Sequence, residues 1–112
     1  MEVSIAQIDC NEIQDFESMH DAFHRVFVFP DFYGRNMDAW IDCMTYLDEP
    51  SAGMTGINVA QGQVLTLELV NAARLRENAP DVYAAVIECA AFVNWRRVND
   101  GGTPVLTLAM DG

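Results

Sequence analysis

Two aspartates, Asp38 and Asp42, have the spacing that most suggests a chemical role in this chain. They follow Asn36, a residue type that often begins helices, and from there the apolar residues recur with a helical period. At about 3.6 residues per turn, the two carboxylates and Thr45 share one face of the predicted helix. The helix dipole explains an acid at Asp38, whereas Asp42 lies a turn further on and is repelled by Asp38. We interpret the pair as a surface for a cationic partner, with a merely solvated acidic face as the alternative.

The stretch before this helix, residues 28–35, is predicted to be a loop because Pro30 and Gly34 punctuate it. It places Phe32 and Tyr33 directly beside the two aspartates. Exposed aromatic side chains next to charge are typical of the anchors of protein interfaces. The alternative is that one or both rings cap the hydrophobic core.

A histidine pair, His20 and His24, has the four-residue spacing of a two-histidine metal site. No further Glu or Cys follows in a recognisable ligand pattern, so we favour a solvated pair at the edge of an apolar helix stripe. We expect no metal and no cofactor.

Catalysis has little support in the sequence. We find no Gly-x-Ser-x-Gly motif, no glycine-rich phosphate loop and no base next to a cysteine. Asp38 and Asp42 lie too close together on one helix to flank a substrate, although two carboxylates can hold magnesium. We therefore expect a protein that is not an enzyme and rank a metal-dependent acidic enzyme last.

The charge of the chain narrows the class of partner. Seventeen acidic residues against six basic ones give a net charge of −11, and all six bases are arginine. Such a chain repels nucleic acid and anionic membranes, so we expect neither as a direct partner and favour a basic protein. The alternative is that acidity only keeps the protein soluble.

The cysteines and the apolar runs suggest where the chain resides. Cys10, Cys43 and Cys89 are odd in number and widely spaced, which favours reduced core thiols over disulfides. No segment has the pattern of a targeting signal or a membrane span. A cytoplasmic location fits best.

The spacing of apolar residues predicts the strands and helices that position the candidate site. We expect one domain over residues 1–112, with strands at about 3–8, 64–70 and 105–110 and helices at about 15–27, 36–47, 72–77 and 80–97. Strands separated by helices favour parallel pairing, and hence an α/β fold. Residues 50–62 lack a period and predict a long loop that is either mobile or folded over a neighbouring surface.

The second predicted helix has an apolar face as well as an acidic one. This face is expected to pack on the core, and it consists of Met37, Trp40, Ile41, Met44 and Leu47.

The run from Pro30 to Asp42, Pro-Asp-Phe-Tyr-Gly-Arg-Asn-Met-Asp-Ala-Trp-Ile-Asp, resembles the barstar family of bacterial inhibitors of the ribonuclease barnase. The order of predicted elements agrees along nearly the whole chain. The resemblance implies a small fold with a three-stranded parallel sheet and about four helices, whose loop and second helix plug a ribonuclease active site. The partner it implies is a basic, barnase-like ribonuclease. The binding positions it implies are Phe32, Gly34, Asn36, Asp38, Asp42 and Thr45.

The chain departs from this family in places that affect binding. Phe32 stands where barstar has tyrosine, and Leu47 where it has tryptophan. Arg96 or Arg97 takes the place of an acid on the last long helix, so the partner is expected to differ from barnase at that edge. A barstar-like module for a different basic protein is therefore the second hypothesis, and residues 50–62 are an insertion relative to barstar.

Overall fold

The computed structural model describes all 112 residues and contains a three-stranded sheet and four α-helices, as predicted. The strands and helices are β1 (Ile5–Asp9), α1 (Phe16–Phe27), α2 (Met37–Thr45), β2 (Leu65–Val70), α3 (Ala72–Asn78), α4 (Pro80–Asn99) and β3 (Leu106–Asp111). Two short 3-10 turns, η1 (Cys10–Glu12) and η2 (Pro50–Ala52), were not predicted. The expected α/β class is confirmed.

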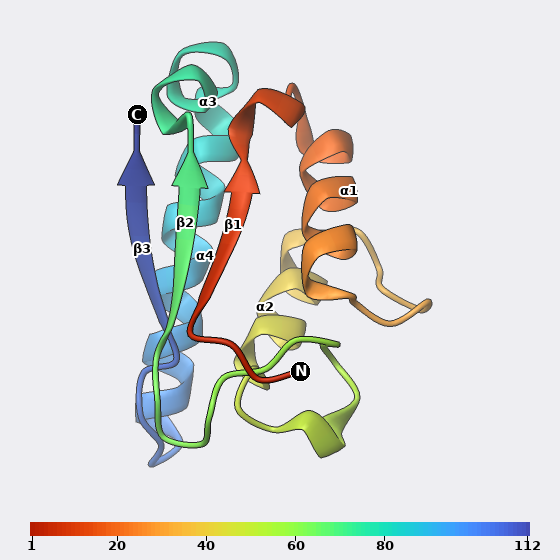
Figure 1. Cartoon of the computed structure of the whole chain (residues 1–112), viewed down its shortest axis with the longest axis vertical. Helices are drawn as coiled ribbons and strands as arrows, with labels where there is room; N and C mark the ends of the chain where they lie inside the picture. The colour runs from red at the N-terminus through yellow and green to blue at the C-terminus, as the bar shows by residue number, and fades with distance from the viewer.

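The sheet has the order β1-β2-β3 with both pairs parallel. Alternate residues of the central strand, Leu65, Leu67 and Leu69, are fully buried, and Ala6 and Ile8 on β1 align with the last two of them. Figure 1 shows α4 running behind the strands, α3 at their carboxyl ends and α1 on the far side of β1. One face of the sheet therefore carries the core, and the residues that alternate with the buried ones are the more exposed.

The two helices nearest the candidate site begin at side-chain caps. Asp15 accepts a hydrogen bond from the backbone N–H of Ser18 at 2.8 Å and opens α1, while Asn36 accepts one from Ala39 at 2.8 Å and opens α2. Phe23 on α1 and Trp40 on α2 are both fully buried and meet edge to face at 5.5 Å between ring centroids. This contact fixes α2 against α1.

The second helix ends earlier than predicted. It stops at Thr45, yet Leu47 beyond its end is fully buried, as are Trp40 and Met44. Met37 and Ile41 are only half-buried, so the apolar face is narrower at its edges than the pattern indicated.

Residues 50–62 fold over a neighbouring surface, which is one of the two alternatives that the sequence left open. The backbone N–H of Gly56 donates to the carbonyl of Phe27 at 2.9 Å, and that of Val59 donates to the carbonyl of Leu47 at 2.9 Å. Asn58 is 6% exposed, and its side-chain amide also donates to Leu47. The segment thereby joins the ends of α1 and α2.

Arg97 joins the end of α4 to the segment after α2. Its guanidinium donates to both carboxylate oxygens of Asp48, at 3.0 and 2.8 Å, and to the carbonyl oxygens of Thr45 and Thr103 at 2.7 and 2.8 Å. The two charged side chains are only 12% and 7% exposed. Four hydrogen bonds thus compensate for the removal of the guanidinium from water.

Arg97→Ala should lower the free energy of unfolding by about 3–5 kcal/mol, because it leaves the buried Asp48 carboxylate without its cation. Urea denaturation measures this value, with Arg74→Ala as the matched control. Arg74 is exposed and its side chain is unpaired, so its removal should cost at most about 0.5 kcal/mol. Equal losses for the two variants would contradict the structural role of Arg97.

Gly56→Ala should also destabilise the fold, by about 1–3 kcal/mol. A Cβ at Gly56 would lie 2.5 Å from the Cβ of Val28, whose φ of +53° is in the left-handed region. Glycine adopts that conformation readily and has no side chain, so Val28→Gly removes the clash. In the Val28→Gly background we expect Gly56→Ala to cost less than about 0.5 kcal/mol. The same cost in both backgrounds would show that Val28 is not the obstacle.

Candidate partner-binding site

The loop of residues 28–35 is anchored to α1 on both sides of its tip. Phe29 is 3% exposed, and its ring lies 6.4 Å from that of His24 on α1 and 4.6 Å from that of Tyr33 within the loop. Arg35 donates to the Asp21 carboxylate at 2.8 Å and to the Glu17 carbonyl at 3.2 Å. These contacts attach the loop to α1 beside the start of α2.

The two aromatic residues at the loop tip have opposite environments. Phe32 is 76% exposed, as an interface anchor requires, but Tyr33 is 7% exposed. The prediction of two exposed rings is therefore wrong for Tyr33, which belongs to the core, the alternative left open from the sequence. Its hydroxyl lies 2.5 Å from Nδ1 of His20.

The prediction of a solvated histidine pair is wrong. His20 is 3% exposed and His24 is half-buried, with its ring 5.9 Å from that of Tyr33. The Tyr33 hydroxyl and Nδ1 of His20 share a hydrogen bond whose direction depends on the tautomer of the imidazole, and it gives both buried groups a partner. Burial, and secondarily the charge of Arg35, hold the pKa of His20 below its ordinary value.

Gly34 and Asn36 shape the start of α2. The Asn36 side chain caps the helix and its amide also donates to the Gly34 carbonyl at 3.3 Å. A Cβ at Gly34 would lie 3.3 Å from that amide nitrogen, so a side chain there would press on the cap. Both residues are exposed. Their role is to set the direction in which α2 leaves the loop.

The acidic face of α2 consists of Asp38 and Asp42, and both residues are exposed. Asp38 makes no side-chain hydrogen bond or ion pair, whereas Asp42 accepts a hydrogen bond from Nη1 of Arg96 at 2.8 Å across to α4. This bond is the main cause that raises the pKa of Arg96. The structure therefore brings a base, Arg96, onto the acidic face.

Thr45 does not share this exposed face. It is 9% exposed, and its hydroxyl donates to the Ile41 carbonyl at 2.6 Å. The prediction of an exposed Thr45 is wrong because α4 packs against the end of α2, where Arg97 also binds the Thr45 carbonyl.

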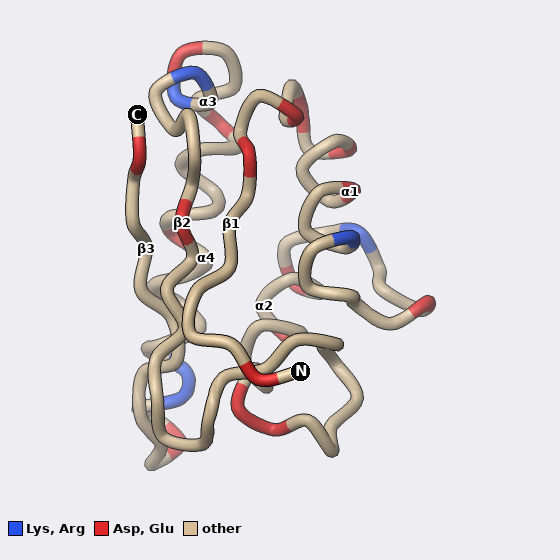
Figure 2. Tube along the Cα trace, viewed as in Figure 1, with Lys and Arg blue, Asp and Glu red and all other residues tan.

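The distribution of charge agrees with the composition. Figure 2 shows acidic residues spread along most of the fold, while basic residues gather at a few places.

No helix in the structure is both long and apolar enough to cross a membrane.

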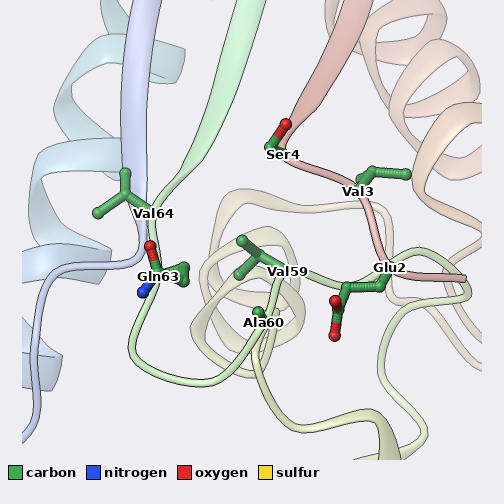
Figure 3. A pocket seen from close by; sticks show the side chains of 7 residues that line it. All are labelled: Glu2, Val3, Ser4, Val59, Ala60, Gln63 and Val64. Atoms are coloured by element: carbon green, nitrogen blue, oxygen red, sulfur yellow. The ribbon is translucent and has the colours of Figure 1, made fainter.

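A hollow lies at the amino ends of β1 and β2, away from the candidate residues (Figure 3). Its volume is about 320 Å³ and its one ionisable side chain is Glu2. It contains none of the candidate residues, and no group of three or more His, Cys, Asp or Glu side chains is close enough to hold a metal ion.

Comparison with known proteins decides the family. A family model described as "Barstar (barnase inhibitor)" matches residues 3–107, nearly the whole chain. The chain belongs to the barstar family. Barstar-family proteins are inhibitors and not enzymes, in agreement with the interpretation of the sequence.

One relative supports this assignment over a shorter region. The protein named "Putative ribonuclease inhibitor YrdF" from Bacillus subtilis (strain 168) is 43% identical over 44 residues. That match covers 38% of this chain and 48% of the relative, so the chain spans about half the length of the relative it matches.

Because His20 is buried, we expect the stability of this protein to depend on pH. The folded state binds a proton at His20 more weakly than the unfolded state, whose pKa is near 6.5, so this contribution to stability is complete above that value and is lost as the pH falls through it. Asparagine at position 20 can still accept the Tyr33 hydrogen bond but does not titrate. We expect the free energy of unfolding of the wild type to fall more steeply than that of His20→Asn between about pH 7.5 and 5. Parallel curves from urea denaturation would contradict this assignment.

Proposed function

We propose that this chain is a stoichiometric inhibitor of a basic ribonuclease and blocks its active site with α2 and the loop before it. The observation that carries the proposal is the exposed pair of carboxylates, Asp38 and Asp42, on a helix fixed at both ends beside the exposed Phe32. Family membership supports the inhibitor role in general terms.

Electrostatics favours a ribonuclease as the target. A site that holds RNA phosphates presents arginine, lysine or histidine, and these groups accept carboxylates placed where the phosphates would sit. The net charge of −11 would also steer the inhibitor toward a basic enzyme.

The seven candidate residues divide into two groups in this proposal. Those that reach the surface contact the enzyme, and they are Phe32, Gly34, Asn36, Asp38 and Asp42. The buried Tyr33 and Thr45 hold the loop and the end of α2 from beneath. The enzyme thus meets a preformed surface and little ordering entropy is lost on binding.

The proposed setting is the cytoplasm, where the chain acts as the immunity partner of a secreted ribonuclease in a toxin–antitoxin pair. Cys10, Cys43 and Cys89 are free thiols, of which two are buried, and this supports a reducing compartment.

A second candidate function is binding of a basic protein other than a ribonuclease. Arg96 on the acidic face favours it, because a uniformly cationic ribonuclease site would repel this guanidinium. An assay of ribonuclease activity distinguishes the two functions, because only the first predicts that the enzyme is inhibited.

The experiment is a titration of ribonuclease activity with the purified chain, using barnase and a panel of other basic microbial ribonucleases. The proposal expects at least one enzyme to be inhibited to completion at one equivalent, with no RNA cleavage by the chain itself. Binding to a basic protein without inhibition of any ribonuclease would favour the second function and overturn the first.

Asp42→Ala should weaken binding to the inhibited ribonuclease by about 2–5 kcal/mol, because truncation leaves a desolvated cation of the enzyme unpaired. Asp38→Ala should cost less in binding and should in addition lower the melting temperature, since Asp38 lies in the first turn of α2. Affinity is measured by inhibition titration at low and high salt, because salt should weaken the steered association.

The matched control is Glu77→Ala, which removes the same charge from an exposed position on α3. Its effect should stay within about 0.5 kcal/mol. If Asp42→Ala and Glu77→Ala behave alike, α2 is not the contact surface.

A further inference from the structure

Arg96 is the base that interrupts the acidic face, and its pairing leaves most of its hydrogen-bonding capacity unused. One N–H, on Nη1, donates to Asp42 at 2.8 Å. A guanidinium has five N–H groups, so four remain for other acceptors. The neighbouring Arg97 makes four hydrogen bonds and its side chain is 12% exposed, against 38% for Arg96. Arg97 is a structural residue, whereas Arg96 is available to a partner.

A hollow of about 500 Å³ lies beside the Arg96–Asp42 pair. Its walls come from α2, from α4 and from the segment of residues 50–54, and the lining residues are Asp42, Tyr46, Ala52, Met54 and Arg96. A second, smaller hollow of about 240 Å³ also reaches Arg96 and includes Tyr46. The guanidinium therefore faces open space large enough for a side chain of another protein.

The electrostatics of docking indicate which side chain that is. When a partner covers the acidic face, Arg96 loses its contact with water, and a cationic neighbour would leave the unused N–H groups without acceptors. An aspartate or glutamate of the partner would satisfy them in the planar, two-bond geometry that guanidinium and carboxylate form. Asp42 would then be free to accept from a cation of the enzyme.

We propose that the hollow beside Arg96 is a binding subsite for an aspartate or glutamate side chain of the ribonuclease. This inference rests on the proposed function and adds the chemistry of the partner at one edge. Arg96 is thus a selectivity residue: it admits ribonucleases that carry a carboxylate next to the cationic site and disfavours those that carry only bases there.

The test asks whether removal of the Arg96 charge strengthens or weakens binding to the ribonuclease. Removing a positive charge from an acidic inhibitor should by itself strengthen binding to a basic enzyme. With the ribonuclease that the wild type inhibits best, we expect the opposite: Arg96→Gln should weaken binding about tenfold and Arg96→Glu about a hundredfold. Unchanged or tighter binding of both variants would overturn the proposal.

Arg74→Gln and Arg74→Glu are the matched controls, because they make the same charge changes on α3 at an exposed arginine whose side chain is unpaired. They should change affinity by less than about twofold. Melting temperatures of all four variants show whether each one is folded.

A charge-exchange experiment distinguishes two roles of Arg96. In the first, Arg96 binds a carboxylate of the partner; in the second, it only links α2 to α4 through Asp42. Each exposed aspartate and glutamate of the same ribonuclease is changed to lysine, one at a time, and tested against Arg96→Glu. One such lysine should restore binding of Arg96→Glu at least about tenfold and weaken binding of the wild type. If no lysine restores binding, Arg96 only links α2 to α4 and the proposed subsite does not exist. If the wild type inhibits no ribonuclease at all, the proposed function itself is wrong, which is a different result.

Discussion

The geometry of the site depends on the guanidinium of Arg97, which holds the end of α4 against the end of α2. It binds the Asp48 carboxylate and the carbonyl oxygens of Thr45 and Thr103, so three segments meet at one buried cation. Residues 50–62 complete the attachment through Gly56 and Val59. At the other end of α2, the Asn36 cap and the Phe23–Trp40 contact fix the first turns. The acidic face is therefore displayed by a helix that is attached to the rest of the fold at both ends.

This rigidity explains why like charges are tolerated on α2. Asp38 and Asp42 repel one another at helical spacing, and a flexible segment would move them apart. Arg96 offsets part of the repulsion by binding Asp42. Its positive charge also makes the acidic face less suited to a uniformly cationic cleft. Stability of the free protein and selectivity for a partner thus depend on the same ion pair.

The sequence predicts the strands and helices well because their apolar periods reflect burial directly, as in β2 and α1. It does not predict which side chains stay exposed where a neighbouring element covers them. Tyr33 and Thr45 follow the expected pattern for surface residues, yet α1 buries the first and α4 the second. Residues 50–62 show no period because their backbone binds the ends of distant helices.

The adjacent arginines illustrate the same limit. Consecutive positions on a helix point in directions about 100° apart, so Arg96 and Arg97 must face different neighbours, but only the packing of α4 on α2 decides which one reaches the surface. The motif from Pro30 to Asp42 is the exception, since a run of fixed residue types identified the family without any knowledge of packing.

The measurement that tests the central claim most directly is competition between this protein and a mononucleotide for the active site of the inhibited ribonuclease. If α2 and its loop occupy the phosphate-binding groups, the apparent dissociation constant should rise in proportion to nucleotide concentration once that exceeds the nucleotide's own dissociation constant. An affinity that does not change with saturating nucleotide would show that the protein binds elsewhere on the enzyme, and would contradict the account.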